Sequence, residues 1–65
     1  MNWDQVEGKW KEFTGSVKSK WGELTDDEIA EMNGDREALE GKIQHTYGKT
    51  KEEAREEVDA FLKNL

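Results

Sequence analysis

The feature that most constrains the fold is one stripe of apolar residues through the first third of the chain. Its members recur every three or four residues: Trp3, Val6, Trp10, Phe13, Val17, Trp21 and Leu24. Because an α-helix turns once in about 3.6 residues, this spacing places them all on one face. Proline is absent, so no residue type in the chain forbids a helix. The segment is predicted to be an amphipathic helix with a buried apolar face.

Three glycines recur every seven residues on the opposite face, at Gly8, Gly15 and Gly22. A glycine inside a helix costs roughly 0.5–1 kcal/mol relative to alanine. Asn2 is predicted to cap the helix and Gly22 to end it. Gly15 is a candidate kink, so the sequence leaves open one bent helix or two short ones. No strand precedes these glycines, as it would in a phosphate-binding loop, and helix breaks with close packing are favoured.

A short helix is predicted next, beginning at Thr25. Thr25 and Glu28 have the spacing of a capping box, in which a hydroxyl and an acid bind free backbone amides. Ile29 and Met32 follow at a spacing of three residues. Asn33-Gly34 is expected to end the helix after about two turns, since both residue types tolerate a left-handed backbone.

A longer helix is predicted between Asp35, a candidate cap, and Gly48, a natural terminator. Its apolar face consists of residues four apart: Leu39, Ile43 and Tyr47. His45, the only histidine, lies off this line and is predicted to be partly exposed and without a catalytic or metal-binding role.

The last helix is predicted to begin with a second capping box, formed by Thr50 and Glu53. A favourable pair is expected between Asp59 and Lys63, four residues apart. The apolar face has a strongly amphipathic pattern: Ala54, Val58, Phe61, Leu62 and Leu65.

The chain has 65 residues, so residues 1–65 are predicted to form a single domain. A domain this small buries only about 60% of the surface of its unfolded chain, and the absence of cysteine excludes disulfides and thiolate metal sites. Exposed apolar residues such as Met32 or Leu65 could mediate dimers. Apolar packing must hold the fold, and the predicted structural core is Trp3, Val6, Trp10, Phe13, Val17, Trp21, Leu24, Ile29, Leu39, Ile43, Tyr47, Val58, Phe61 and Leu62.

A faint internal repeat relates the two halves of the chain. Val6-Glu7-Gly8-Lys9-Trp10 matches Leu39-Glu40-Gly41-Lys42-Ile43, and Gly15 matches Gly48, with an offset of 33 residues throughout. Each half would then be a helical hairpin that cannot bury its own stripe. The predicted fold is all-α, a compact bundle of four to five short helices that resembles two crossed helical hairpins.

Net charge is −6, and it is unevenly distributed. Residues 1–24 hold four basic and four acidic side chains, whereas residues 25–65 hold six basic and twelve acidic ones. An acidic balance opposes general binding of nucleic acids, which requires neutralised phosphates. Neither a signal peptide nor a membrane span is visible, and a cytoplasmic location is expected.

The tryptophans of the first helix and its lysines (Lys9, Lys11, Lys18 and Lys20) also suit a helix on a membrane surface, or a platform on which bases stack. The stripe is favoured as core, because leaving it in water would forfeit several kcal/mol of apolar burial. The lysines spread around the helix and do not form one stripe.

Two clusters of acids, Asp26-Asp27-Glu28 and Glu52-Glu53-Glu56-Glu57, could in principle bind calcium or act as acid and base. Both lie at predicted helix N-termini, where acids interact favourably with the helix dipole, and this structural role is favoured. No catalytic, cofactor-binding or metal-binding residues are predicted, and no cofactor is expected.

Several motifs resemble the CsbD-like family over nearly the whole chain, from Asn2 to about Phe61. They are Asn2-Trp3-Asp4, Glu7-Gly8, Trp10-Lys11, Gly15, Trp21-Gly22, Leu24-Thr25-Asp26-Asp27, Gly41-Lys42-Ile43-Gln44 and Tyr47-Gly48. The resemblance implies a small bacterial protein, induced under general stress, of unassigned biochemical activity and with a compact bundle of short helices. It transfers no catalytic residue to this chain.

The leading functional hypothesis is a non-enzymatic stress-response protein that acts through its surface, as a protective or interaction module. It rests on the resemblance, on the missing catalytic constellation and on a very hydrophilic composition, with a mean hydropathy of −1.14 and 40% charged residues. The alternative is a small regulatory module that binds a protein or nucleic-acid partner. The partner is unknown in either case.

Overall fold

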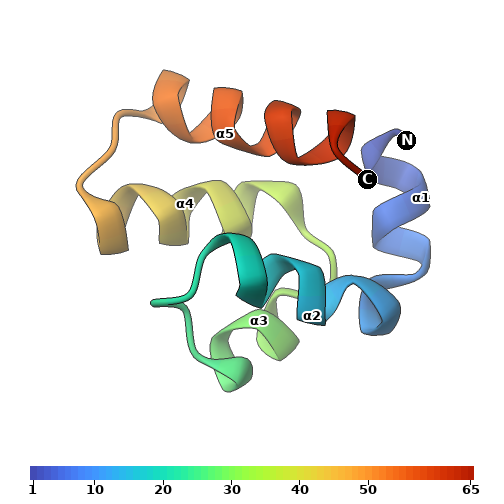
Figure 1. Ribbon diagram of the computed structural model, residues 1–65. Coiled ribbons are helices and arrows are strands. Elements are labelled where there is room, and N and C mark those ends of the chain that lie inside the picture. The colour runs from blue at the N-terminus through green and yellow to red at the C-terminus, as the bar shows by residue number, and fades with distance from the viewer.

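A computed structural model describes all residues from Met1 to Leu65 and contains five helices and no strand (Figure 1). This confirms the all-α prediction and the predicted number of helices. The helices are, in chain order, α1 (Trp3–Gly8), α2 (Trp10–Lys20), α3 (Asp26–Met32), α4 (Arg36–Tyr47) and α5 (Lys51–Lys63).

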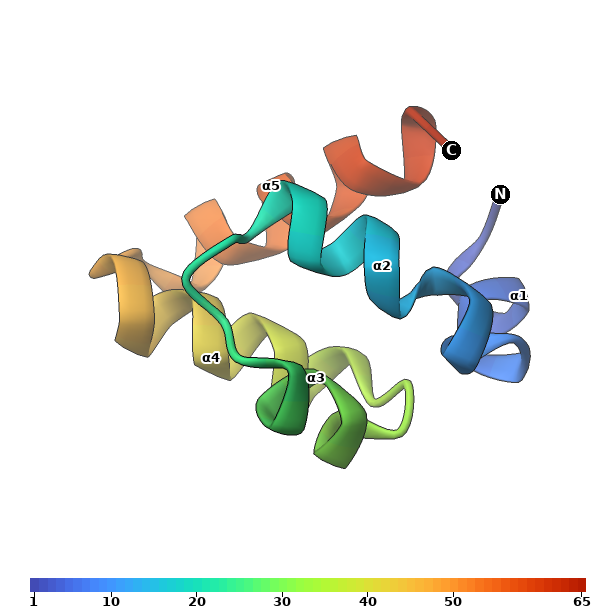
Figure 2. The same ribbon diagram turned by 60° about the horizontal axis from the view of Figure 1, so that its bottom comes forward.

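The helices pack as two pairs, with α1 across one end. Helices α4 and α5 run antiparallel and side by side, while α2 packs on α3 (Figure 1). Seen from a second direction, α3 lies in front of α4 and α2 in front of α5, and the two chain termini are close together (Figure 2). The pairing agrees with the predicted hairpins. The repeat itself is not reproduced locally, because Gly8 ends α1 whereas the matching Gly41 lies inside α4.

The core lies between the pairs. Ten of the predicted core residues are buried, and four are half-buried against them, namely Trp3, Phe13, Tyr47 and Leu62. The twelve buried apolar residues are Val6, Trp10, Val17, Trp21, Leu24, Ile29, Met32, Leu39, Ile43, Ala54, Val58 and Phe61.

The expectation of an exposed Met32 was wrong. Met32 is only 5% exposed, because it follows Ile29 by three residues on the face of α3 that packs against α2. Leu65, at 41% exposure, does remain at the surface. Ala54, which was not among the predicted core residues, is fully buried on α5.

Each tryptophan combines apolar packing with a hydrogen bond from its indole nitrogen to another part of the chain. Trp3 Nε1 donates to the Gly34 carbonyl at 2.7 Å and Trp10 Nε1 to the Ile29 carbonyl at 2.9 Å. Trp21 Nε1 donates to Glu57 Oε1 at 2.9 Å. Since a buried indole N–H needs an acceptor, these bonds specify where α1 and α2 dock.

The first apolar segment breaks at Lys9 and not at Gly15. Helix α2 continues through Gly15 and ends at Lys20, two residues before Gly22. At the break, Lys9 has φ −122° and ψ 36°, outside helical geometry. The periodicity could not locate this break, because the apolar spacing continues across it.

Close packing does not account for the glycines of α1 and α2. A Cβ added at Gly8 or Gly15 would meet nothing within 4 Å. The close approach occurs elsewhere, at Gly34, where the turn between α3 and α4 meets the backbone of Glu7 in α1.

Gly15→Ala is therefore expected to stabilise the protein by about 0.5–1 kcal/mol, because alanine loses less backbone entropy in a helix and finds free space here. The midpoint and slope of urea unfolding measure the change. Gly41→Ala, inside α4 and equally free of neighbours, should show the same gain. A loss of stability in both variants would contradict the open environment of these positions.

The predicted cap of α1 and the predicted ends of α3, α4 and α5 are confirmed. Thr25 and Glu28 form one capping box, and Thr50 and Glu53 another. Asn2 and Gln5 form a third, so Asn2 caps as predicted with an added partner. The Asp35 carboxylate accepts from the first turn of α4. Left-handed residues end two helices, Asn33 at φ 51° and Gly48 at φ 66°.

The first capping box predicts a specific acid sensitivity. Hydrogen bonds from the Thr25 amide and the Lys42 ammonium lower the pKa of Glu28 from 4.5 to about 2. A carboxylate with a lowered pKa stabilises the fold above its unfolded-state pKa, and this contribution is lost as the pH falls through the folded-state value. Glu28→Gln, which can still accept from Thr25, is expected to flatten the fall in unfolding free energy between about pH 5 and about pH 2.

Denaturant unfolding across this pH range measures the effect. Glu31→Gln is the control, because its carboxylate lies on the same helix but is exposed and takes no part in the cap. Equal flattening by both substitutions would show that net charge, and not the capping box, sets the acid response.

Candidate functional site

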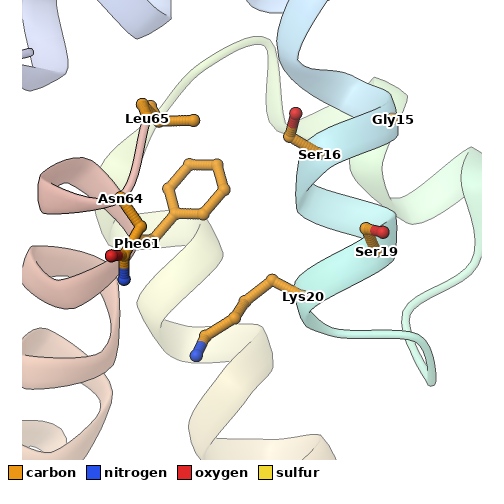
Figure 3. A pocket seen from close by; sticks show the side chains of 7 residues that line it. All are labelled: Gly15, Ser16, Ser19, Lys20, Phe61, Asn64 and Leu65. Carbon is orange, nitrogen blue, oxygen red and sulfur yellow. The ribbon is translucent and has the colours of Figure 1, made fainter.

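The largest hollow on the surface lies between α2 and the C-terminal end of α5 (Figure 3). Its volume is about 430 Å³, and it is shallow and open to solvent. Helix α2 contributes its small, polar side, and the Phe61 ring points across from α5. The lining residues are Gly15, Ser16, Ser19, Lys20, Phe61, Asn64 and Leu65.

The chemistry of this hollow is that of a contact surface. It offers two serine hydroxyls, one amide and the Lys20 ammonium around an aromatic floor. A serine nucleophile needs an adjacent base, and the lining contains neither an imidazole nor a carboxylate. The arrangement can hold an anionic or hydroxyl-bearing group by hydrogen bonds.

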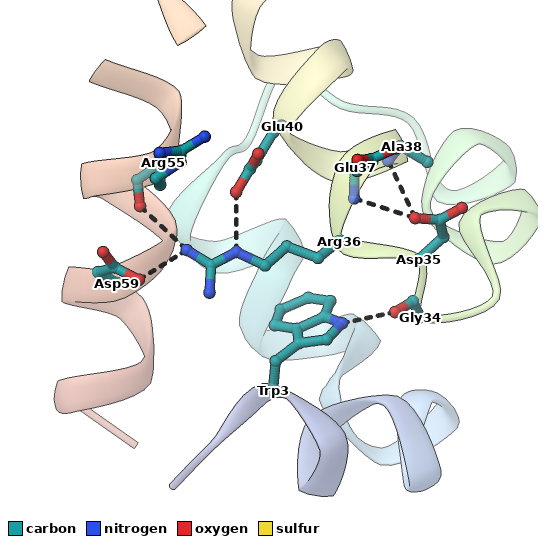
Figure 4. A network of polar contacts seen from close by, with 9 residues as sticks. All are labelled: Trp3, Gly34, Asp35, Arg36, Glu37, Ala38, Glu40, Arg55 and Asp59. Carbon is teal, nitrogen blue, oxygen red and sulfur yellow. Dashed lines mark hydrogen bonds and ion pairs between the residues drawn. The ribbon is translucent and has the colours of Figure 1, made fainter. Parts of the chain in front are cut away.

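A polar network around Arg36 joins α4 to α5 (Figure 4). Arg36 Nε binds Glu40 Oε2 at 2.8 Å, and Nη2 binds Asp59 Oδ1 at 2.6 Å and the Arg55 carbonyl at 3.3 Å. The Glu40 side chain is only 8% exposed, whereas that of Asp59 is 55% exposed. The guanidinium therefore neutralises the one buried carboxylate of the protein.

Partial burial on its own would lower the pKa of Arg36. Hydrogen bonds to Asp59 and Glu40 outweigh it, and the pKa of Arg36 is raised above its usual value. The predicted pair of Asp59 with Lys63 is replaced by this contact. The planar guanidinium of Arg36 donates to two carboxylates at once. The Lys63 ammonium, on the outer face of α5, does not offer this geometry.

One acid of the first acidic cluster and two of the second make structural contacts. Glu28 caps α3 and pairs with Lys42 at 3.1 Å. Glu53 caps α5, and Thr50 lowers its pKa through backbone and side-chain hydrogen bonds. Glu57 accepts from Trp21 Nε1 and lies 3.8 Å from Lys49.

The side chains are not assembled into a metal site or into a site centred on the histidine. No three His, Cys, Asp or Glu side chains are grouped so that they could hold a metal ion. His45 is exposed on α4, away from the hollow between α2 and α5.

Basic side chains are distributed over the molecule without forming a patch. Lys42 and Lys49 are paired with acids, and Lys18 donates to the Leu24 carbonyl at 2.7 Å. The remaining side-chain cations without an ion pair are exposed, with several acids between them on α5 but only Glu12 between them on α2. They belong to α2 and α5 or adjoin them: Lys9, Lys11, Lys20, Lys51, Arg55 and Lys63.

Sequence reasoning did not find the Arg36 network or the hollow. The spacing of Arg36 and Glu40, four residues apart on one helix, is a usable signal for half of the network. Asp59 lies 23 residues from Arg36, and nothing local connects them. The hollow likewise combines residues 15–20 with residues 61–65 and exists only in the folded chain.

Comparison with known proteins gives consistent similarities. A family model described as CsbD-like matches residues 4–56. A UPF0337 protein of Bordetella pertussis is 57% identical over 62 residues, which cover 95% of this chain and 94% of that protein. A UPF0337 protein of Pseudomonas aeruginosa is 48% identical over the full length of both.

The UPF0337 protein YjbJ of Escherichia coli K12 is 50% identical over 58 residues, covering 89% of this chain and 84% of that protein. No solved structure matches the chain. Among the five helices, none combines the length and the apolar character that a membrane crossing requires.

Proposed function

The chain belongs to the CsbD-like family, and on that premise we propose that it is a non-enzymatic protein of the bacterial stress response, which acts through its surface as a protective or interaction module. The observation that carries the proposal is the inward orientation of the apolar side chains. Only Met1 and Leu65 are large hydrophobic residues exposed at the surface. What meets other molecules is polar and mostly anionic.

The charge of this surface supports a protective role. A net charge of −6 on 65 residues keeps copies of the protein apart and holds water at their surface. A charged and hydrated protein can keep other proteins apart when loss of water makes them expose apolar segments. It adds no apolar surface of its own. This action requires abundance and hydration, and it requires no binding pocket.

The shape of the candidate site supports a role without catalysis. Its largest hollow has hydroxyls and one ammonium but no base beside them. The carboxylates with hydrogen-bond partners are used to cap helices, to neutralise Arg36 and Lys42 and, at Glu57, to accept from the Trp21 indole. No set of side chains takes the roles of nucleophile, base and charge-stabilising donor.

The alternative, a regulatory module for a nucleic-acid or protein partner, has weaker support. The free cations of α5 are interspersed with acids, and Lys11 and Lys20 lie on opposite sides of α2, so they would not follow one phosphate backbone. A partner protein would fit best along the hollow between α2 and α5, where serine hydroxyls line the surface and the buried Phe61 ring lies beneath it. Tight binding of DNA that weakens steeply with salt would favour this alternative.

A protection assay tests the proposal. A heat- and drying-sensitive enzyme is dried or heated with the protein, and its recovered activity is compared with that obtained with a scrambled peptide of the same composition. We expect higher recovery with the folded protein. Trp21→Ala, which removes a fully packed side chain, separates the effect of the fold from that of composition. Equal recovery with protein and scrambled peptide would contradict a protective role for the folded surface.

A further inference from the structure

The apolar stripe of the N-terminal segment continues through the break between α1 and α2 without a change of phase. The chain leaves helical geometry at Lys9, yet Val6 and Trp10 keep the four-residue step of a helix. At about 100° per residue, a straight helix over residues 3–20 would bring five apolar side chains into an arc of about 80°. They are Trp3, Val6, Trp10, Phe13 and Val17.

The break at Lys9 follows Gly8, the last residue of α1, and helix α2 has no side-chain cap. A glycine permits a break without fixing its angle. Docking fixes the angle and holds α1 out of line. Trp3 Nε1 binds the Gly34 carbonyl at 2.7 Å, and Glu7 rests against the same glycine. Without this docking, residues 3–20 are free to form one straight helix.

In the straight helix the lysines would lie along the edges of the apolar arc, an arrangement that they do not have in the bundle. Lys9 and Lys20 would flank one edge of the apolar arc, within about 40°, and Lys11 and Lys18 the other edge, within about 80°. Asp4 and Glu7 would share the second edge with Lys11 and Lys18, and Glu12 would lie away from the arc, so the edge with Lys9 and Lys20 is the basic one. Lysines at the edge of an apolar face are suited to a helix that lies in a membrane interface, where the ammonium groups reach the lipid phosphates.

We propose that residues 2–21 leave the bundle and straighten into one amphipathic helix on an anionic lipid surface. The inference is independent of the protective role proposed above, whose assay contains no lipid. Residues 1–24 carry no net charge, and the acidic excess of residues 25–65 stays in water.

The exchange gives the departing segment new partners, while the apolar side chains that it covered in the bundle lose that cover. The stripe passes from the core of the bundle to the boundary of the acyl chains and remains out of water. The three indole N–H groups give up Gly34, Ile29 and Glu57 and find acceptors among the headgroups, where tryptophan is favoured. The Lys9 amide already donates to the Val6 carbonyl at 3.2 Å, so straightening exchanges this bond for an α-helical one.

Vesicles with brominated acyl chains test the proposal. Trp10 and Trp21 are only 7% and 2% exposed in the bundle, so a shift in emission would not separate the two burial sites. Quenching by bromine in the lipid reports contact with the acyl chains directly. We expect quenching with vesicles of phosphatidylglycerol and phosphatidylcholine, much less with phosphatidylcholine alone, and increased helix content by circular dichroism. Absent quenching, or equal quenching by both vesicles, would overturn the proposal.

A proline distinguishes the straight helix from the bundle. Lys11 is exposed and is the second residue of α2, where the amide has no partner within the helix, so Lys11→Pro is tolerated in the bundle. The same residue lies inside the straight helix, where proline removes a hydrogen bond. We expect vesicle binding to fall at least about tenfold. Glu52→Pro, at the same position of α5, is the control and should bind as the wild type does. Equal binding by Lys11→Pro and Glu52→Pro would contradict straightening.

Charge reversal tests the lysine edges. Lys9→Glu/Lys20→Glu is expected to weaken binding to anionic vesicles at least about tenfold, because each lysine near such a surface contributes substantially to attraction. Lys51→Glu/Lys63→Glu changes the net charge equally on exposed positions of α5 and should weaken it far less. All four lysines lack ion-pair partners, so both variants are expected to fold. Equal losses would show that net charge alone governs binding and would overturn the proposed orientation.

Discussion

Gly34→Ala is expected to destabilise the protein by roughly 2–5 kcal/mol, out of a total of roughly 3–10 kcal/mol for a domain of this size. Gly34 has φ 82°, a left-handed conformation that costs an alanine about 1–2 kcal/mol. The added Cβ would also lie 2.8 Å from Glu7 Cγ and 2.9 Å from Glu7 Cα. Because one of these atoms is backbone, α1 must move, and the bond from Trp3 to the Gly34 carbonyl is strained with it.

Urea unfolding followed by circular dichroism measures the loss, and Gly48→Ala is the matched control. Gly48 also ends a helix in the left-handed region, at φ 66°, but its added Cβ meets nothing within 4 Å. The unfolding free energy of this variant should fall only by the cost of a left-handed alanine, about 1–2 kcal/mol. The difference between the two variants isolates the contact between α1 and the turn. If both lost the same stability, the close approach of Glu7 to Gly34 would be refuted.

Arg36→Met is expected to cost about 2–3 kcal/mol, because it leaves the Glu40 carboxylate buried without a counter-charge. The value lies at the low end for a broken buried pair, since the Arg36 side chain is 27% exposed and water screens part of the charge. Lys42→Met breaks the more exposed pair with Glu28 and should cost less than about 1 kcal/mol.

The double variant Arg36→Met/Glu40→Leu separates the two contributions to that loss. Removing both charges and filling the space with apolar side chains is expected to restore stability to within about 1 kcal/mol of the wild type. Thermal and urea unfolding of the single and double variants complete the cycle. A double variant as unstable as Arg36→Met would mean that the bonds to Asp59 and Arg55 hold α4 to α5, and that the buried carboxylate is not the cause.

Cap chemistry explains why the helix ends were predictable. A capping box needs a hydroxyl and an acid three residues apart, and the boxes at Thr25 and Thr50 form as the spacing predicts. The left-handed residues at Asn33 and Gly48 are equally local. Apolar periodicity identified most of the core for the same reason, since it reports which face of each helix must leave water.

The candidate site was less accessible to such reasoning. The hollow between α2 and α5 joins segments from the two ends of the chain, and Asp59 reaches Arg36 from a different helix. The resemblance to a known family supplied the expected stress role, but no residue role came with it.

Helix type, helix ends and the inward face of each helix followed from interactions within about four residues, which composition and spacing record directly. The break at Lys9, the burial of Met32 and the partner of Asp59 followed from contacts between helices. Helix α1 lies out of line although the apolar pattern continues, because the partly buried indole hydrogen bond from Trp3 and the close contact at Gly34 hold it there. Such contacts depend on where distant segments meet, and no local pattern encodes that position.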